Sequence, residues 1–129
     1  MNRRSSLRLF GLVLLLGLPG CDSPLLPWGG GDVEIRIQNA SSFPFARVDV
    51  VFPEDQVSYG SLSANSASAY RGVSKAYRYA YIEVEIGGEE LVIQPIDYVG
   101  ESLLGSGRYT YVLNVTVEGH LTLDFREDD

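Results

Sequence analysis

The sequence has very few of the side chains that build metal clusters and catalytic triads. Its 129 residues include one cysteine and one histidine, which excludes a disulfide framework and a Cys/His metal cluster. The histidine, His120, directly follows Gly119, and we expect it in an exposed turn. No G-x-S-x-G motif supplies a nucleophile. The sequence therefore does not predict catalysis by a Ser/His/Asp triad.

Basic residues are also scarce. Ten Lys and Arg residues stand against 17 Asp and Glu residues, which gives a net charge of −7 and a pI of about 4.6. This balance argues against nucleic acid as a partner, because phosphates need a basic surface. Hydrophobic residues, in contrast, make up 45% of the chain, and this share predicts a packed core in one domain.

No apolar run near the N-terminus is long enough to span a membrane. The run Leu9–Leu18 is free of charge and follows Arg3, Arg4 and Arg8. As a helix it would extend roughly 15 Å, about half of a bilayer core. A buried N-terminal helix is the alternative, but Pro19-Gly20 follows at once and breaks it. The pattern therefore favours the apolar region of a secretory signal peptide.

The end of this run, Leu18-Pro19-Gly20-Cys21, resembles the lipobox of bacterial lipoproteins. Leu18 matches the aliphatic position and Gly20 the small residue before the cleavage point, whereas Pro19 departs from the usual residue. The resemblance implies that a diacylglyceryl group is attached to the Cys21 thiol and that the signal peptide is cut just before it. We therefore expect a protein of the bacterial cell envelope, held in a membrane by lipid at Cys21.

Two features of this N-terminal region leave alternatives open. The segment Asn2–Arg8 is similar to a twin-arginine export signal, although Ser6 stands where that motif prefers Phe. Asp22 directly follows the cysteine; it resembles an inner-membrane retention signal of enteric bacteria, while acidic residues near the cysteine accompany surface export in other lineages. The route of export, the membrane and its leaflet therefore stay open.

These signals divide the chain into three parts. Residues 1–20 are the expected signal peptide, 21–31 the lipidated cysteine and a Pro/Gly-rich linker, and 32–129 one domain. Trp28 and Leu25-Leu26 of the linker could lie in the lipid interface or pack on the domain.

Residues 32–129 show the period-two alternation of β-strands and no convincing helical stripe. Val33–Gln38, Ala46–Phe52, Tyr79–Ile86 and Tyr109–Val117 alternate, and Gly87-Gly88 and Gly119 mark hairpin turns. About seven or eight short strands with one buried face predict an all-β fold, a single antiparallel β-sandwich. We expect it to be immunoglobulin-like or transthyretin-like, with an open barrel as the alternative. The segment Gly107–Leu113 resembles a motif at the start of a strand that is common in secreted bacterial β-sandwich proteins.

Tyrosines form the strongest candidate site. With Ala80, Ile82 and Ile86 buried, Tyr77, Tyr79 and Tyr81 should point outward from one strand face. Such a stripe can stack on sugars or anchor a protein partner, but it can also be a cross-strand ladder that only stabilises the sheet. We include Arg78 in the candidate surface. We expect the neighbouring basic side chains to make the stripe less acidic than the rest; they are Arg71, Lys75 and Arg78.

Carboxylates are plentiful but are not arranged in an evident cleft. Glu83 and Glu85 share one strand face and could approach Glu90, a spacing that a hydrolase could use. Because nothing in the sequence builds a cleft around them, we favour a solvated sheet face. The patterns Asn39-Ala40-Ser41 and Asn114-Val115-Thr116 match N-glycosylation sites but carry no meaning in a bacterial lipoprotein. The sequence thus favours a non-catalytic, membrane-anchored module that binds a protein or glycan. We expect it to need no metal and no cofactor. A structural subunit of an envelope complex, or less favourably a small carboxylate-dependent hydrolase, is the alternative.

Overall fold

The computed structural model of the chain describes residues 32–95 and 100–128. The expected signal peptide, Cys21 and the linker lie outside these residues. The described parts form nine strands: β1 Val33–Asn39, β2 Phe45–Val51, β3 Gln56–Leu62, β4 Ser66–Ala67, β5 Arg71–Val73, β6 Tyr81–Ile86, β7 Glu89–Ile93, β8 Gly107–Val115 and β9 Leu121–Glu127. Within residues 32–95 and 100–128, no helix is long and apolar enough to cross a bilayer.

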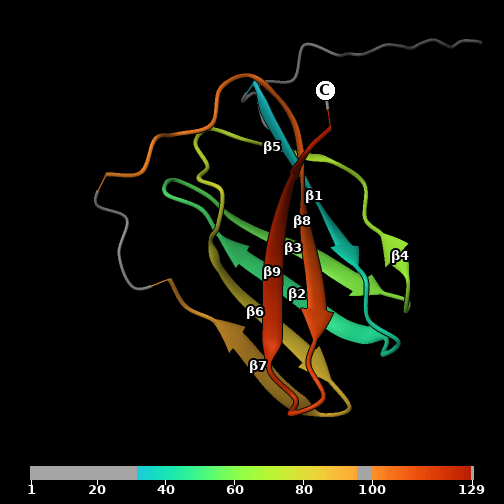
Figure 1. Cartoon of the computed structure of the whole chain (residues 1–129). Helices are drawn as coiled ribbons and strands as arrows, with labels where there is room; N and C mark the ends of the chain where they lie inside the picture. Colours follow the sequence, from blue (N-terminus) through green and yellow to red (C-terminus); the bar gives the residue numbers. More distant parts are fainter. Residues whose placement is uncertain (1–31, 96–99, 129) are drawn as a thin grey trace, which may run out of the picture.

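The strands form two sheets, as Figure 1 shows. The first has the order β4-β1-β8-β9, with β5 also paired to β1, and the second has the order β3-β2-β6-β7. The two sheets remain separate, so the all-β sandwich is confirmed and the open barrel is not formed. The short strands β4 and β5 both pair with β1, and they bring the strands in the described parts to nine where about seven or eight were expected.

Most of the alternating residues that we predicted to be buried form the core between the sheets, whereas Ile86 is only partly buried and Val117 is fully exposed in the turn after Val115. Ile35, Ile37, Ile82 and Val84 are fully buried, and so is Leu113. Tyrosines complete this core: the hydroxyl of Tyr59 donates a hydrogen bond to the Ile35 carbonyl at 2.9 Å. Burial raises the pKa of Tyr59, so its phenol stays neutral and keeps this bond between the sheets.

One strand pair is parallel, which the sequence did not indicate. β1 and β8 run in the same direction, from Val33 opposite Gly107 to Asn39 opposite Leu113. Parallel neighbours need a long connection, and here the chain forms the whole second sheet before β8 returns beside β1. Alternation reports which face is buried but not the direction of the neighbouring strand, so this pair could not be read from it.

A β-bulge changes which residues at the start of β2 face the core. Alternation placed Ala46 inward with Val48, but Ala46 is exposed and Phe45 is buried. The register between β2 and β3 shifts between Phe45 and Val48 and again beside Gly60, whose φ is +76°. An extra residue in one strand reverses the face on which the following side chains lie. A large aromatic ring therefore enters the core where the period predicted alanine.

Asp128, which directly follows β9, forms hydrogen bonds on the outer face of the first sheet. Its Oδ2 accepts hydrogen bonds from the hydroxyls of Tyr70 at 2.7 Å and Thr110 at 2.6 Å, and Oδ1 accepts one from Arg126 at 2.9 Å. Burial raises the pKa of Asp128, but these three donors outweigh it and lower the pKa to about 2. The folded protein therefore holds this carboxylate in its charged form.

Substituting Asp128→Asn is expected to lower the free energy of unfolding at neutral pH by about 1 to 2 kcal/mol. The folded pKa lies below the unfolded value of about 3.9, so the charged form stabilises the fold above that value. This stabilisation is lost as the pH falls towards about 2. Denaturation at a series of pH values should show the difference between the two proteins shrinking across this window. A difference that stays constant down to the lower value would contradict the assignment.

Candidate tyrosine-lined binding site

The three predicted tyrosines lie around one hollow at the surface. Tyr77, Tyr79 and Tyr81 are half-buried and line a hollow of about 320 Å³; the other lining residues are Val51, Phe52 and Pro53. The rings of Tyr77 and Tyr79 are stacked, with centroids 6.4 Å apart and planes 21° apart. Tyr77 and Tyr79 belong to the connection between β5 and β6, and only Tyr81 begins a strand. The expectation of one strand face is therefore corrected to a loop that folds over the end of β2.

The core holds this loop in place. The ring of Phe52 stacks on the ring of Tyr111, with centroids 6.2 Å apart. The Tyr111 hydroxyl donates a hydrogen bond to the carbonyl of Tyr77 at 2.6 Å. The Leu104 amide donates to the carbonyl of Ala76 at 2.9 Å. Because these contacts come from buried or hydrogen-bonded groups, the fold itself sets the shape of the hollow. A preformed site of this kind lowers the entropic cost of binding.

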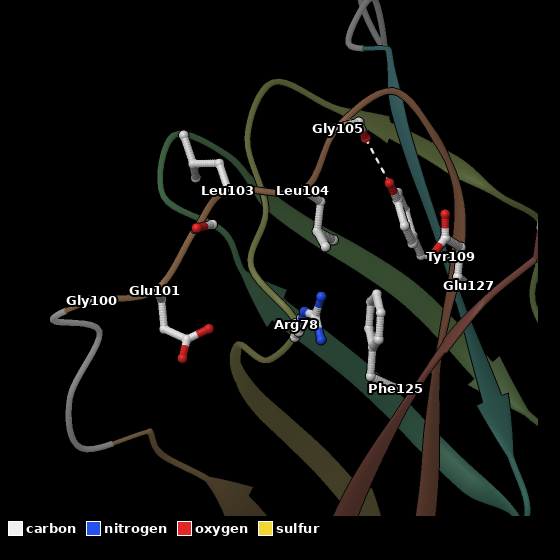
Figure 2. A pocket seen from close by; sticks show the side chains of 10 residues that line it. Arg78, Gly100, Glu101, Leu103, Leu104, Gly105, Tyr109, Phe125 and Glu127 are labelled. Atoms are coloured by element: carbon white, nitrogen blue, oxygen red, sulfur yellow. Dashed lines mark hydrogen bonds between the residues drawn. The ribbon is translucent and has the colours of Figure 1, made fainter.

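Arg78 does not belong to this hollow, although its neighbours on both sides do. Its guanidinium lies over the ring of Phe125, with the carbon 5.7 Å from the centroid. It lines a second hollow, of about 390 Å³, together with Glu101, Leu104 and Tyr109; Figure 2 shows these side chains. The Tyr109 hydroxyl donates to the carbonyl of Gly105 there, at 2.8 Å. The candidate surface is therefore divided, with the tyrosines on one side of the loop and Arg78 on the other.

The remaining basic side chains near the stripe are also engaged elsewhere. The Arg71 guanidinium donates to the carbonyl of Ser58 at 3.2 Å and lies near the Tyr59 ring. The Lys75 ammonium lies 3.1 Å from the carboxylate of Glu54. The expectation that Arg71, Lys75 and Arg78 reduce the acidity of the stripe is therefore not supported by their positions.

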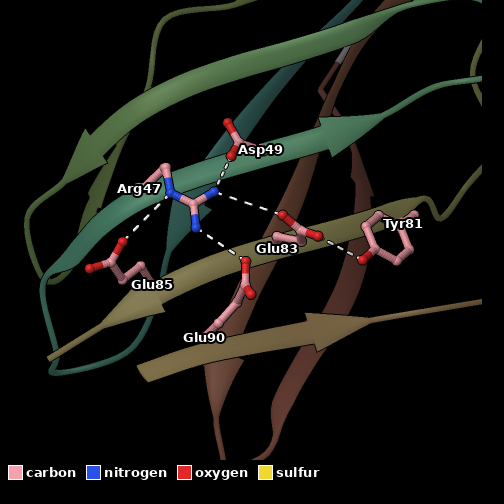
Figure 3. A network of polar contacts seen from close by, with 6 residues as sticks. All are labelled: Arg47, Asp49, Tyr81, Glu83, Glu85 and Glu90. Atoms are coloured by element: carbon pink, nitrogen blue, oxygen red, sulfur yellow. Dashed lines mark hydrogen bonds and ion pairs between the residues drawn. The ribbon is translucent and has the colours of Figure 1, made fainter. Parts of the chain in front are cut away.

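A band of carboxylates adjoins the hollow on the outer face of the second sheet. Figure 3 shows Arg47 of β2 surrounded by the side chains of Asp49, Glu83, Glu85 and Glu90. The guanidinium nitrogens lie 3.8 Å from Glu83, 3.6 Å from Glu85 and 3.1 Å from Glu90. Hydrogen bonds to Glu90 and Asp49 raise the pKa of Arg47, so the guanidinium stays charged. We name these five residues the acidic band.

Tyr81 joins the hollow to the acidic band. Its hydroxyl donates to the carboxylate of Glu83 at 2.7 Å, as Figure 3 shows, and this bond raises the pKa of Tyr81. The alternation of the sequence placed Glu83, Glu85 and Glu90 near one another, but it missed Arg47. The signal was present, because Arg47 and Asp49 have the outward parity of β2. The sequence did not indicate that β2 pairs with β6, and this pairing brings Arg47 opposite Glu85.

The groups on this surface are aromatic rings, carboxylates and one guanidinium. Glu83, Glu85 and Glu90 lie around one guanidinium on a sheet face, whereas other residues line the two hollows described above. His120 follows the turn between β8 and β9, is exposed and lines neither of those hollows. Within residues 32–95 and 100–128, no group of three or more His, Cys, Asp or Glu side chains is arranged to hold a metal ion. Aromatic rings beside carboxylates favour an apolar group that carries positive charge.

Comparison with known proteins supports the fold alone. No family model matches the chain, and no curated protein matches it. Among solved structures, the chain is similar to the NMR structure of a protein from Eubacterium rectale, with a TM-score of 0.56 and 11% sequence identity. The similarity covers 75% of this chain and 90% of that one. At this identity the likeness concerns the arrangement of strands and carries no information on the ligand.

Proposed function

We propose that the chain is a membrane-anchored lipoprotein of the bacterial cell envelope that binds a partner through its tyrosine-lined hollow. The observation that carries the binding role is the preformed hollow around Tyr77, Tyr79 and Tyr81. Tyrosines supply large, rigid contact surfaces at low entropic cost and are enriched where proteins bind one another. The anchoring role is supported by the lipobox-like segment Leu18–Cys21.

The position of the hollow fits an anchored protein. Val33, at the start of β1, pairs with Val73, and the loop that carries Tyr77 and Tyr79 begins directly after that strand. This loop therefore begins beside the residue at which the linker joins the domain. A linker over residues 21–31 reaches at most about 40 Å when fully extended. The proposed partner is thus met close to the membrane surface.

Photo-cross-linking in living cells tests the binding role. Val51 lines the hollow and is 40% exposed, so a photoreactive p-benzoylphenylalanine placed there should contact a bound partner. We expect a discrete adduct of higher mass after irradiation of cells that naturally produce the protein. The substitution Tyr79→Ala in the same chain should reduce this adduct about tenfold, because loss of an aromatic anchor costs 1 to 2 kcal/mol or more.

Val117 provides the matched control position. It is also a valine and is fully exposed, but it lies in the turn between β8 and β9. The photoreactive residue at Val117 should give no such adduct. An equal adduct from both positions, or an adduct from Val51 that survives Tyr79→Ala, would overturn the assignment of the hollow as the binding site.

A further inference from the structure

The acidic band runs directly into the tyrosine-lined hollow. On the outer face of the second sheet, cross-strand pairs follow one another in the order Arg47 opposite Glu85, Asp49 opposite Glu83, and Val51 opposite Tyr81. Neighbouring outward positions on one strand lie about 6.6 Å apart. A ligand seated against Tyr81 is therefore one such step away from a carboxylate pair.

This band has more negative than positive charge. Its four carboxylates surround one guanidinium, so three negative charges are left without a compensating charge within the band. Asp49 and Glu83 lie directly opposite each other on neighbouring strands, and like charges in such a pair repel. The Arg47 guanidinium contacts both, but Glu85 and Glu90 share it, so it offsets only part of this repulsion. Residues 32–129 together contain 16 acidic and seven basic residues. A cationic ligand would relieve this repulsion, whereas an anionic one would add to it.

We propose that the hollow binds a lysine or arginine side chain from an extended, basic segment of a partner protein, whose further cations lie along the acidic band. This inference rests on the proposed function of the hollow. The aliphatic stem of the side chain packs on the rings of Tyr77 and Tyr79, and its charged end lies over aromatic faces beside Glu83. The hollow of about 320 Å³ has room for one such side chain.

The spacing of the band favours an extended segment over a small free cation. Tyr81, Glu83 and Glu85 occupy successive outward positions of β6. The side chains on one face of an extended peptide repeat with the same period of about 6.6 Å. Cations at alternate positions of the partner can therefore meet the hollow, the Glu83 region and the Glu85 region at the same time. A small cation would use the hollow alone.

Binding of defined peptides to the full chain in nonionic detergent tests this inference. The probe is a short fluorescent peptide with lysine at alternate positions and serine between them, and the comparison peptides carry glutamate or norleucine in place of lysine. Fluorescence anisotropy should show binding of the lysine peptide about tenfold or more tighter than that of the norleucine peptide, and no binding of the glutamate peptide. The affinity for the lysine peptide should fall as salt is added.

Matched variants separate the site from the overall charge of the protein. Glu83→Gln should weaken binding of the lysine peptide about tenfold. Asp124→Asn removes the same charge from an exposed position of β9 in the other sheet and should change affinity less than about twofold. Tyr79→Phe, which keeps the ring, should retain most of the affinity that Tyr79→Ala loses.

The outcomes distinguish this inference from the function on which it rests. Equal binding of the lysine and norleucine peptides, lost in Tyr79→Ala, would overturn the cationic class but leave the hollow as a binding site. Equal losses from Glu83→Gln and Asp124→Asn would show that only net charge attracts the peptide, which overturns the proposed site of the cation. Failure of the lysine peptide to bind at all also overturns the inference, whereas the cross-linking result at Val51 decides the function of the hollow separately.

Discussion

Substituting Asn39→Ala is expected to lower the free energy of unfolding by about 3 to 5 kcal/mol. Asn39 ends β1 and is fully buried. Its amide nitrogen donates to the carbonyls of Phe43, Leu62 and Ser63 at 2.8, 3.4 and 3.1 Å. Its oxygen accepts from the amide and hydroxyl of Ser41 at 2.9 and 2.7 Å. One side chain thus joins the end of the first sheet to the end of β3 in the second.

The size of this effect follows from the groups that the substitution leaves behind. Alanine supplies neither donor nor acceptor, so the amide and hydroxyl of Ser41 lose the oxygen that accepts from them. The carbonyls of Phe43 and Ser63 keep only their bonds from the hydroxyls of Ser41 and Ser66. Each unsatisfied buried polar group costs about 1 to 3 kcal/mol. Small domains are stable by only about 5 to 15 kcal/mol in total, so the loss is a large share of the fold's stability. Chemical denaturation at neutral pH measures it from the shift in midpoint.

Asn114 provides the matched control, because it stands in the same Asn-x-Ser/Thr pattern. It is exposed on β8, and its side-chain oxygen accepts only a local hydrogen bond from the amide of Val115 at 2.8 Å. Asn114→Ala should change the free energy of unfolding by less than about 0.5 kcal/mol. Similar effects at both positions, or a loss below about 1 kcal/mol at Asn39, would contradict the role of Asn39 as a link between the sheets.

Asn39 also shows where the sequence-based prediction was incomplete. The Asn39-Ala40-Ser41 pattern was noted only as a glycosylation match without meaning. The same three residues fit a local turn in which asparagine bonds the backbone two residues on, and the structure contains that bond. The carbonyls of Leu62 and Ser63 are more than 20 residues away, so their part in the network depends on how β3 is placed. No local pattern reports that placement.

Most of the fold was predictable because one physical rule, the alternation of buried and exposed side chains, applies along each strand. This rule correctly placed Ala80 and Ile82 in the core. It did not predict the parallel direction of β8 beside β1 or the bulge that buries Phe45. Both depend on partners far along the chain, and the same composition is compatible with either arrangement.

The candidate site was predictable to a similar extent. The cluster of tyrosines identified the residues, since large aromatic rings that are left out of the core mark contact surfaces. The direction of Arg78 was not predictable, because residues 74–80 form a connection in which the period of a strand no longer applies. The carboxylates of the acidic band were identified in the sequence one by one. The place of Arg47 among them was not predictable, because it depends on the pairing of β2 with β6.

Substituting Cys21→Ser is expected to remove the lipid that we propose holds the mature protein in the membrane. If Cys21 carries a diacylglyceryl group, two or more acyl chains hold the protein, and each buried CH₂ contributes about 0.8 kcal/mol. Serine has no thiol to take the lipid, so the variant should lose incorporation of a fatty-acid analogue. Metabolic labelling measures this loss, and the mass of the variant should still include residues 1–20. Mass spectrometry of the mature unsubstituted protein should find its N-terminus at Cys21.

A shifted cysteine tests whether position or the mere presence of a thiol matters. Cys21 is the single cysteine of the chain, so combining Cys21→Ser with Ser23→Cys moves the thiol from one position to three positions past Gly20. We expect no labelling of this variant, because the lipobox-like spacing from Leu18 is lost. Labelling of Cys21→Ser, or an intact Met1 on the mature protein, would overturn the anchor. It would also remove the reason for placing the partner near a membrane, since only the linker over residues 21–31 ties the tyrosine-lined hollow to that surface.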